Sequence, residues 1–131
     1  MKLITFETGG ETAAGFIDGE DAVICVTGES ARTAVRNLAD KGEAALETWQ
    51  KSSGRRVPLG EIRLLSPIPD PVRDVFCVGK NYYAHAAEFH SSGFDSSGKE
   101  EVPAHPVVFT KATTSVCGPG DTVKGSLDPT G

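Results

Sequence analysis

Hydrophobic and polar positions alternate along the first part of the chain with the two-residue period of β-strands. Residues 2–7 and 12–18 have this pattern, and a glycine pair separates them. An Asp-Gly dipeptide then gives a strong tight-turn signal before the apolar run 22–26. The pattern therefore predicts a small meander of three strands.

The period changes after residue 30 to the three-and-four spacing of helices. Ser30 can cap a first helix. Its single apolar stripe consists of Ala31, Ala34, Val35, Leu38 and Ala39. A second helix is predicted from Asp40, because Asp40 and Glu43 have the spacing of a capping box. Leu46 and Trp49 lie on the apolar side of this second helix.

A proline-rich stretch marks a division of the chain. Residues 57–65 predict one further strand, and residues 66–71 predict an extended linker. Proline fixes its own φ angle and cannot donate to a sheet, which stiffens such a segment. We place a domain boundary near residue 70, with an α+β module at 1–70 and a second domain at 71–131. Nothing in the first module carries recognisable chemistry.

The second domain opens with two apolar runs separated by a helix and a loop. Residues 75–78, bounded by a glycine, predict a buried strand, and Asn81 is a suitable N-cap for the short helix after it. Residues 107–110 predict another buried strand, which ends at Lys111. The polar, glycine-rich stretch 91–98 suits either a lid over a ligand or an ordinary surface loop, and the sequence leaves both open.

Composition excludes several classes of protein. A net charge of -5 over 131 residues argues against nucleic-acid binding, which requires a basic surface. No apolar run approaches the roughly 20 residues of a membrane helix, and the start lacks the apolar core of a signal peptide. We therefore expect no membrane partner and a cytoplasmic protein. The cysteines are three and far apart, so neither a disulfide framework nor a zinc site is expected.

The chemistry that stands out is on the predicted helix after Asn81. His85 and Glu88 are three residues apart and share one helical face. A histidine beside a carboxylate can act as a general base, although such a pair is also common on solvated helices. His85 and His90 are five apart, which does not suit two metal ligands on one helix. We interpret His85 and Glu88 as a metal-free dyad, and His90 and His105 as surface residues.

Three segments in order resemble a known family. Residues 77–88 read Cys-Val-Gly-Lys-Asn-Tyr-Tyr-Ala-His-Ala-Ala-Glu, which resembles the segment that opens the catalytic domain of the fumarylacetoacetate hydrolase family. Residues 106–111 and 118–121 resemble the strand and turn that follow in that family. The resemblance implies that 71–131 is the beginning of the mixed β-roll of this catalytic domain. It also implies metal ligands on an acidic strand and a later aspartate, expected after Gly131, so we interpret the chain as an N-terminal fragment without a bound metal.

The resemblance implies a function for the intact parent protein. It predicts a hydrolase that cleaves a C–C bond in a 1,3-dicarbonyl (diketone) or acylpyruvate-type 2-oxo acid. The reaction passes through an enolate held by Mg²⁺ or Mn²⁺, with Ca²⁺ as a further candidate. The active form is predicted to be a homodimer. His85, oriented by Glu88, is then the catalytic base. The residues implied in substrate binding are Lys111, Lys80, Asn81 and Tyr82. A decarboxylase, isomerase or hydratase of the same family, or a non-catalytic module, are the alternatives, and the fragment alone is expected to be inactive.

Overall fold

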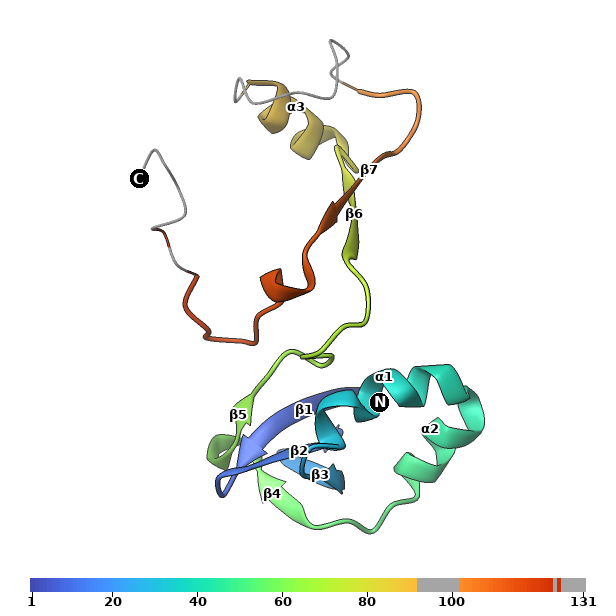
Figure 1. Cartoon of the computed structure of the whole chain (residues 1–131), viewed down its shortest axis with the longest axis vertical. Coiled ribbons are helices and arrows are strands. Elements are labelled where there is room, and N and C mark those ends of the chain that lie inside the picture. The colour runs from blue at the N-terminus through green and yellow to red at the C-terminus, as the bar shows by residue number, and fades with distance from the viewer. Residues whose placement is uncertain (92–101, 124, 126–131) are drawn as a thin grey trace. The chain divides into compact units, whose positions relative to one another are not determined.

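The computed structural model describes residues 1–91, 102–123 and 125, which form two units of helices and strands (Figure 1). The first unit contains residues 1–71 and the described residues from Val116 onward, and the second is Val72–Ser115. The fold class is α+β, as predicted. Most of the stretch 91–98, predicted as a lid or loop, and the final residues 127–131 lie outside the described residues.

The first unit is built on an antiparallel sheet of five strands in the order β4-β3-β2-β1-β5. Its strands are β1 (Lys2–Thr8), β2 (Glu11–Asp18), β3 (Asp21–Thr27), β4 (Arg56–Pro58) and β5 (Arg63–Leu64). The first three pair consecutively, so the predicted meander is confirmed. A bulge between Ala14 and Gly15 shifts the register of β2 against β3.

The two short strands at the edges show that the sheet is curled. A flat sheet of five strands would separate its edge strands by about 19 Å, at about 4.8 Å per neighbour. The chain passes from β4 to β5 in five residue steps, which span at most about 18 Å, and less here because Leu59–Glu61 is a 3-10 turn. The single strand predicted over 57–65 is therefore wrong. Pro58 ends the pairing with β3, and the chain crosses to the opposite edge.

Two helices, α1 (Ala31–Lys41) and α2 (Glu43–Gln50), follow β3. The predicted stripe of α1 is buried except for Ala39, and α1 packs on β1 and β2. Ser30 occupies the predicted N-cap position of α1, although its side chain makes no cap hydrogen bond. The cap predicted at Asp40 is wrong, because Asp40 lies inside α1 rather than at the start of α2. The helices are separated at Gly42, whose φ of 71° is left-handed and ends α1.

The sheet has a packed cluster on each side. One cluster contains Ile4, Phe6, Ala13, Ala22, Ile24 and Val57. The other lies under α1 and contains Ala14, Ala31, Ala34 and Val35, with Trp49 and Ile68 among the partly buried residues packed against it. Neighbouring positions of β1 and β2 belong to opposite clusters, which is the alternation that defined the strands in the sequence.

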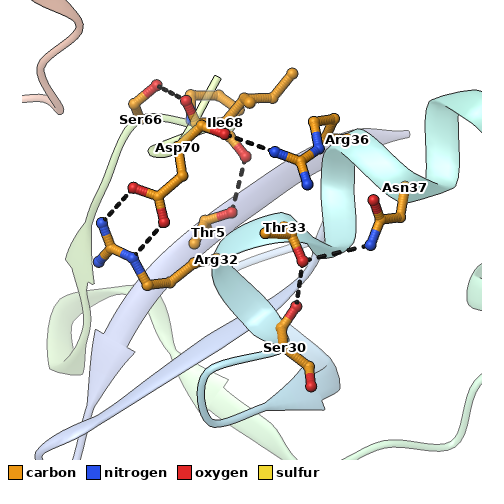
Figure 2. Close-up of polar contacts among 10 residues, drawn as sticks. Thr5, Ser30, Arg32, Thr33, Arg36, Asn37, Ser66, Ile68 and Asp70 are labelled. Carbon is orange, nitrogen blue, oxygen red and sulfur yellow. Dashed lines mark hydrogen bonds and ion pairs between the residues drawn. The ribbon is translucent and has the colours of Figure 1, made fainter. Parts of the chain in front are cut away.

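The proline-rich segment after β5 is docked on the first unit rather than solvated (Figure 2). The Thr5 hydroxyl, fully buried in β1, donates to the carbonyl of Pro67 at 2.8 Å. Arg32 donates from Nε and Nη2 to the two carboxylate oxygens of Asp70 at 2.6 and 2.9 Å, and Arg36 donates to the Asp70 carbonyl at 2.8 Å. The segment predicted as an extended linker is thus held to β1 and α1 as far as Asp70.

The residues after 115 also contact this unit. A Cβ on Gly118 would lie 2.9 Å from the Cα of Leu65, so the backbones approach closely at this glycine. The turn predicted at 118–121 is present, with Asp121 accepting from the Gly118 amide at 2.8 Å. Arg63 on β5 donates to Asp121 at 3.2 Å, so this turn is tied to the edge of the sheet.

The second unit contains the hairpin of β6 (Val75–Gly79) and β7 (Val107–Lys111), with α3 (Tyr83–Ser91) between them in sequence and a 3-10 turn at Thr113–Ser115. Both strands lie where they were predicted, but they are not buried. Phe76 is 73% exposed and Val108 58% exposed. Among the described residues this sheet has two strands, and no second layer of described residues covers most of its apolar side chains.

Helix α3 begins one residue later than the Asn81 cap would place it. The Tyr82 carbonyl accepts the first helical hydrogen bond, from the Ala86 amide at 2.9 Å, so Tyr82 stands in the cap position. Within the described residues, no helix combines the length and the apolar character needed to cross a bilayer.

Candidate functional site

A cavity of about 350 Å³ lies at the beginning of α3 in the second unit. One part of its wall is the turn from β6 into α3, with Lys80, Asn81 and Tyr82, and another part is the segment 102–106. Its volume is at the lower end of the range of about 300–1,000 Å³ found for small-molecule sites. Three of the residues predicted to bind substrate are thus brought together at one cavity.

Lys80 has an unusual backbone and an unusual environment. Of the residues that the structure describes, it is the one non-glycine with a positive φ angle, 50°. A left-handed conformation costs an L-residue roughly 1–2 kcal/mol, and such strain is concentrated at functional sites. Lys80 is also 8% exposed, although lysine is rarely buried. The sharp turn after β6 therefore places a buried cationic residue in the cavity wall.

The predicted dyad lies on α3 next to this cavity. The His85 ring is partly buried and contacts the Tyr82 ring, with 5.2 Å between centroids and planes tilted by 35°. Tyr82 itself lines the cavity, so His85 is one aromatic ring away from it. Glu88 is exposed on the next turn of the helix. Residues three apart on a helix lie on one face, which allows Glu88 to act on the imidazole.

Lys111 is at the other end of the hairpin. Gly79, at the end of β6, pairs with Val107, whereas Lys111 pairs with Val75, four residues earlier at the start of β6. At about 3.3 Å per residue the two ends are about 13 Å apart. The structure therefore does not bring Lys111 to the cavity that Lys80 lines, and its part in substrate binding stays a prediction.

His105 was interpreted from the sequence as a surface residue. The structure shows it exposed, and also in the cavity wall. No local spacing could have indicated this, because the wall forms only when 102–106 is brought back to the start of α3 by the pairing of β6 with β7. Pro106 supplies the only local signal, since the residue before a proline is held near extended backbone.

No metal centre can be built from the side chains that the structure describes. Within residues 1–91, 102–123 and 125, no group of three or more His, Cys, Asp or Glu side chains could hold an ion. The family resemblance implied ligands for a divalent ion only after Gly131, so the metal requirement stays a prediction that the described residues do not test. Burial raises the pKa of the Cys25 thiol, against an opposing hydrogen bond with Ser52, which disfavours a reactive thiolate there.

Both halves of the chain match families of known proteins. Residues 74–127 match the C-terminal domain of fumarylacetoacetate hydrolase, and residues 1–67 match the Rv2993c-like N-terminal domain. The chain is 42% identical over 72 residues to the oxaloacetate tautomerase YisK of Bacillus subtilis, an alignment that covers 55% of this chain and 22% of that protein. It is 30% identical over 93 residues to a mitochondrial oxaloacetate tautomerase of Xenopus laevis, covering 69% and 26% respectively.

A solved structure supports the same assignment over nearly the whole chain. The chain superposes on fumarylacetoacetate hydrolase from Exiguobacterium antarcticum with a TM-score of 0.59 and 27% identity, covering 98% of this chain and 42% of that one. The chain thus spans less than half the length of these relatives. Two consecutive family matches and the shared fold together show that this chain belongs to the fumarylacetoacetate hydrolase family, in which the relatives matched here are enzymes, named as hydrolases and tautomerases.

Proposed function

We propose that the protein carrying this chain moves a proton at the carbon beside the carbonyl of a 2-oxo acid and so interconverts its keto and enol forms. The observation that carries the proposal is the position of His85 beside a cavity whose wall contains the buried Lys80. The names of two relatives, both oxaloacetate tautomerases, support the same reaction.

Each residue at the cavity has a function that its chemistry permits. Removal of a proton beside a carbonyl leaves an enolate, and the positive charge of the buried Lys80 can stabilise it. Asn81 and Tyr82 offer hydrogen-bond donors that can orient the oxo acid. His85 takes the proton from carbon and returns it to the enolate oxygen, which completes the conversion without other reactants. Glu88, three residues further along the same helical face, orients the imidazole between these two transfers.

Hydrolysis of a C–C bond is the second candidate, and the Exiguobacterium antarcticum relative, named as a hydrolase, favours it. In that reaction His85 takes a proton from water as the water oxygen bonds to the carbonyl carbon of a 1,3-dicarbonyl compound. The adjacent C–C bond then breaks, and its electron pair leaves as an enolate that accepts a proton. The same residues serve both reactions, because both pass through an enolate.

Metal dependence and assembly are further predictions for the complete gene product. A requirement for Mg²⁺ or Mn²⁺ predicts loss of activity after dialysis against a chelator and recovery when either ion is added back. A homodimer predicts twice the monomer mass in light scattering. Neither prediction enters the reactions above.

The two candidate reactions are separated by spectrophotometric assays of the complete gene product. We expect accelerated decay of the enol absorbance of oxaloacetate, and slower or no loss of the diketone absorbance of an acylpyruvate. His85→Ala and Glu88→Gln are each expected to reduce the active reaction by roughly 10²–10⁴-fold. His90→Ala, an exposed histidine in the last turn of the same helix, is the matched control and is expected to retain the rate. Normal rates in both dyad variants would refute the assignment.

A further inference from the structure

We propose that His105 binds the second carboxylate of a dicarboxylic 2-oxo acid in the cavity that Lys80 also lines. This inference rests on the proposed function and makes it more specific, because it selects a substrate with two carboxylates over one with a single carboxylate. His105 then determines substrate choice and takes no part in the proton transfer.

The charges of the cavity wall support a doubly anionic ligand. The wall contains two residues that can carry positive charge, Lys80 in the turn before α3 and His105 in the segment 102–106. None of the described residues that line the cavity is Asp or Glu. The remaining lining residues are apolar or neutral polar, including Val78, Val102 and Pro103.

The size of the cavity suits such a ligand. A volume of about 350 Å³ corresponds to on the order of ten water molecules, at about 30 Å³ each in the liquid. A four-carbon dicarboxylic 2-oxo acid has about nine non-hydrogen atoms and can be contained in this volume. Its two carboxylates are at opposite ends of the carbon chain, and Lys80 and His105 come from two different segments of the wall. One ligand can therefore contact both basic residues.

The local sequence holds His105 in place. Pro106 restricts the backbone of the residue before it to extended conformations, and β7 begins directly afterwards at Val107. Val107 pairs with Gly79, the last residue of β6 and the neighbour of Lys80. The backbone that carries His105 is thus connected through two residues to the strand pair that carries Lys80. A preorganised donor loses less entropy on binding than one on a free loop.

The test compares two 2-oxo acids with the complete gene product. Oxaloacetate has two carboxylates, and 2-oxobutanoate has the same number of carbons and one carboxylate. For both, exchange of the C3 hydrogens in D₂O is followed by NMR, and the uncatalysed rate is subtracted. We expect His105→Gln to lower kcat/KM for oxaloacetate roughly 10- to 100-fold, mainly through KM, because a hydrogen bond to a charged group is lost.

Three further measurements use the same exchange assay. His105→Gln is expected to leave kcat/KM for 2-oxobutanoate within about threefold, which also shows that the variant is folded. His105→Arg is expected to restore most of the oxaloacetate value, and the control His90→Gln to change neither substrate. A His105→Gln variant that affects both substrates equally, or neither, would overturn the inference while leaving the proposed function intact. A wild-type protein that exchanges neither substrate would overturn the proposed function and this inference with it.

Discussion

Substitution of Thr5 by valine tests whether the proline-rich segment is part of the first unit. The Thr5 side chain is fully buried in β1, and its hydroxyl donates to the Pro67 carbonyl, 62 residues away in sequence, at 2.8 Å. Valine retains the branched shape and the strand preference of threonine but removes the donor. The Pro67 carbonyl then loses its partner in a part-buried position. A net hydrogen bond contributes about 1 kcal/mol and an unsatisfied buried acceptor costs about 1–3 kcal/mol, so we expect a loss of about 1–2 kcal/mol.

Urea unfolding followed by fluorescence measures this loss. Trp49 is the single tryptophan of the chain and packs against the cluster under α1, as does Ile68 from the proline-rich segment. With a slope of about 1–3 kcal/mol/M, the midpoint should fall by roughly 0.3–2 M. Thr27→Val, at the exposed end of β3, is the matched control and should change stability by less than about 0.5 kcal/mol. Equal midpoints for Thr5→Val and wild type would show that the hydrogen bond does not hold this segment.

Three other substitutions test separate parts of the structure. Gly15→Ala should destabilise the first unit by at least about 2 kcal/mol in the same urea assay, because the new Cβ would lie 1.7 Å from the Val23 carbonyl oxygen, and wild-type stability would contradict the bulge. The hydrogen bond from Arg32 lowers the pKa of Asp70, so the stability it contributes is present above about pH 4 and is lost as the pH falls through the lowered pKa. Asp70→Asn should thus cost up to about 1 kcal/mol at pH 7 and much less at pH 3, and a pH-independent difference would refute this. In the complete gene product, Lys80→Met should lower kcat/KM for the oxo acid about 10²-fold, and an unchanged value would remove Lys80 from the site.

Local periodicity was sufficient to predict the elements whose partners are close in sequence. The three-strand meander and the buried stripe of α1 depend on neighbouring residues, and both are present. The strand predicted over 57–65 failed because its two ends pair with opposite edges of a curled sheet. The start of α2 failed because Gly42, and not the Asp40 side chain, decides where α1 ends.

Features that depend on packing between distant segments were harder to predict from the sequence. The runs 75–78 and 107–110 are apolar enough to predict buried strands, but burial is decided by a covering layer, and these strands are largely exposed. The sequence identified the segment with Lys80, Asn81 and Tyr82 through its resemblance to a family, and the structure places these residues at one cavity. It could not identify His105, because that residue reaches the cavity through the pairing of β6 with β7.

The most direct test of the account is whether His85 moves a proton on carbon. The complete gene product is incubated with oxaloacetate in D₂O, and exchange of the C3 hydrogens is followed by NMR in wild type, His85→Ala and His90→Ala. We predict that His85→Ala loses roughly 10²–10⁴-fold of the catalysed exchange rate, while His90→Ala, an exposed histidine in the last turn of the same helix, keeps it. Catalysed exchange that continues at the wild-type rate in His85→Ala would contradict the account.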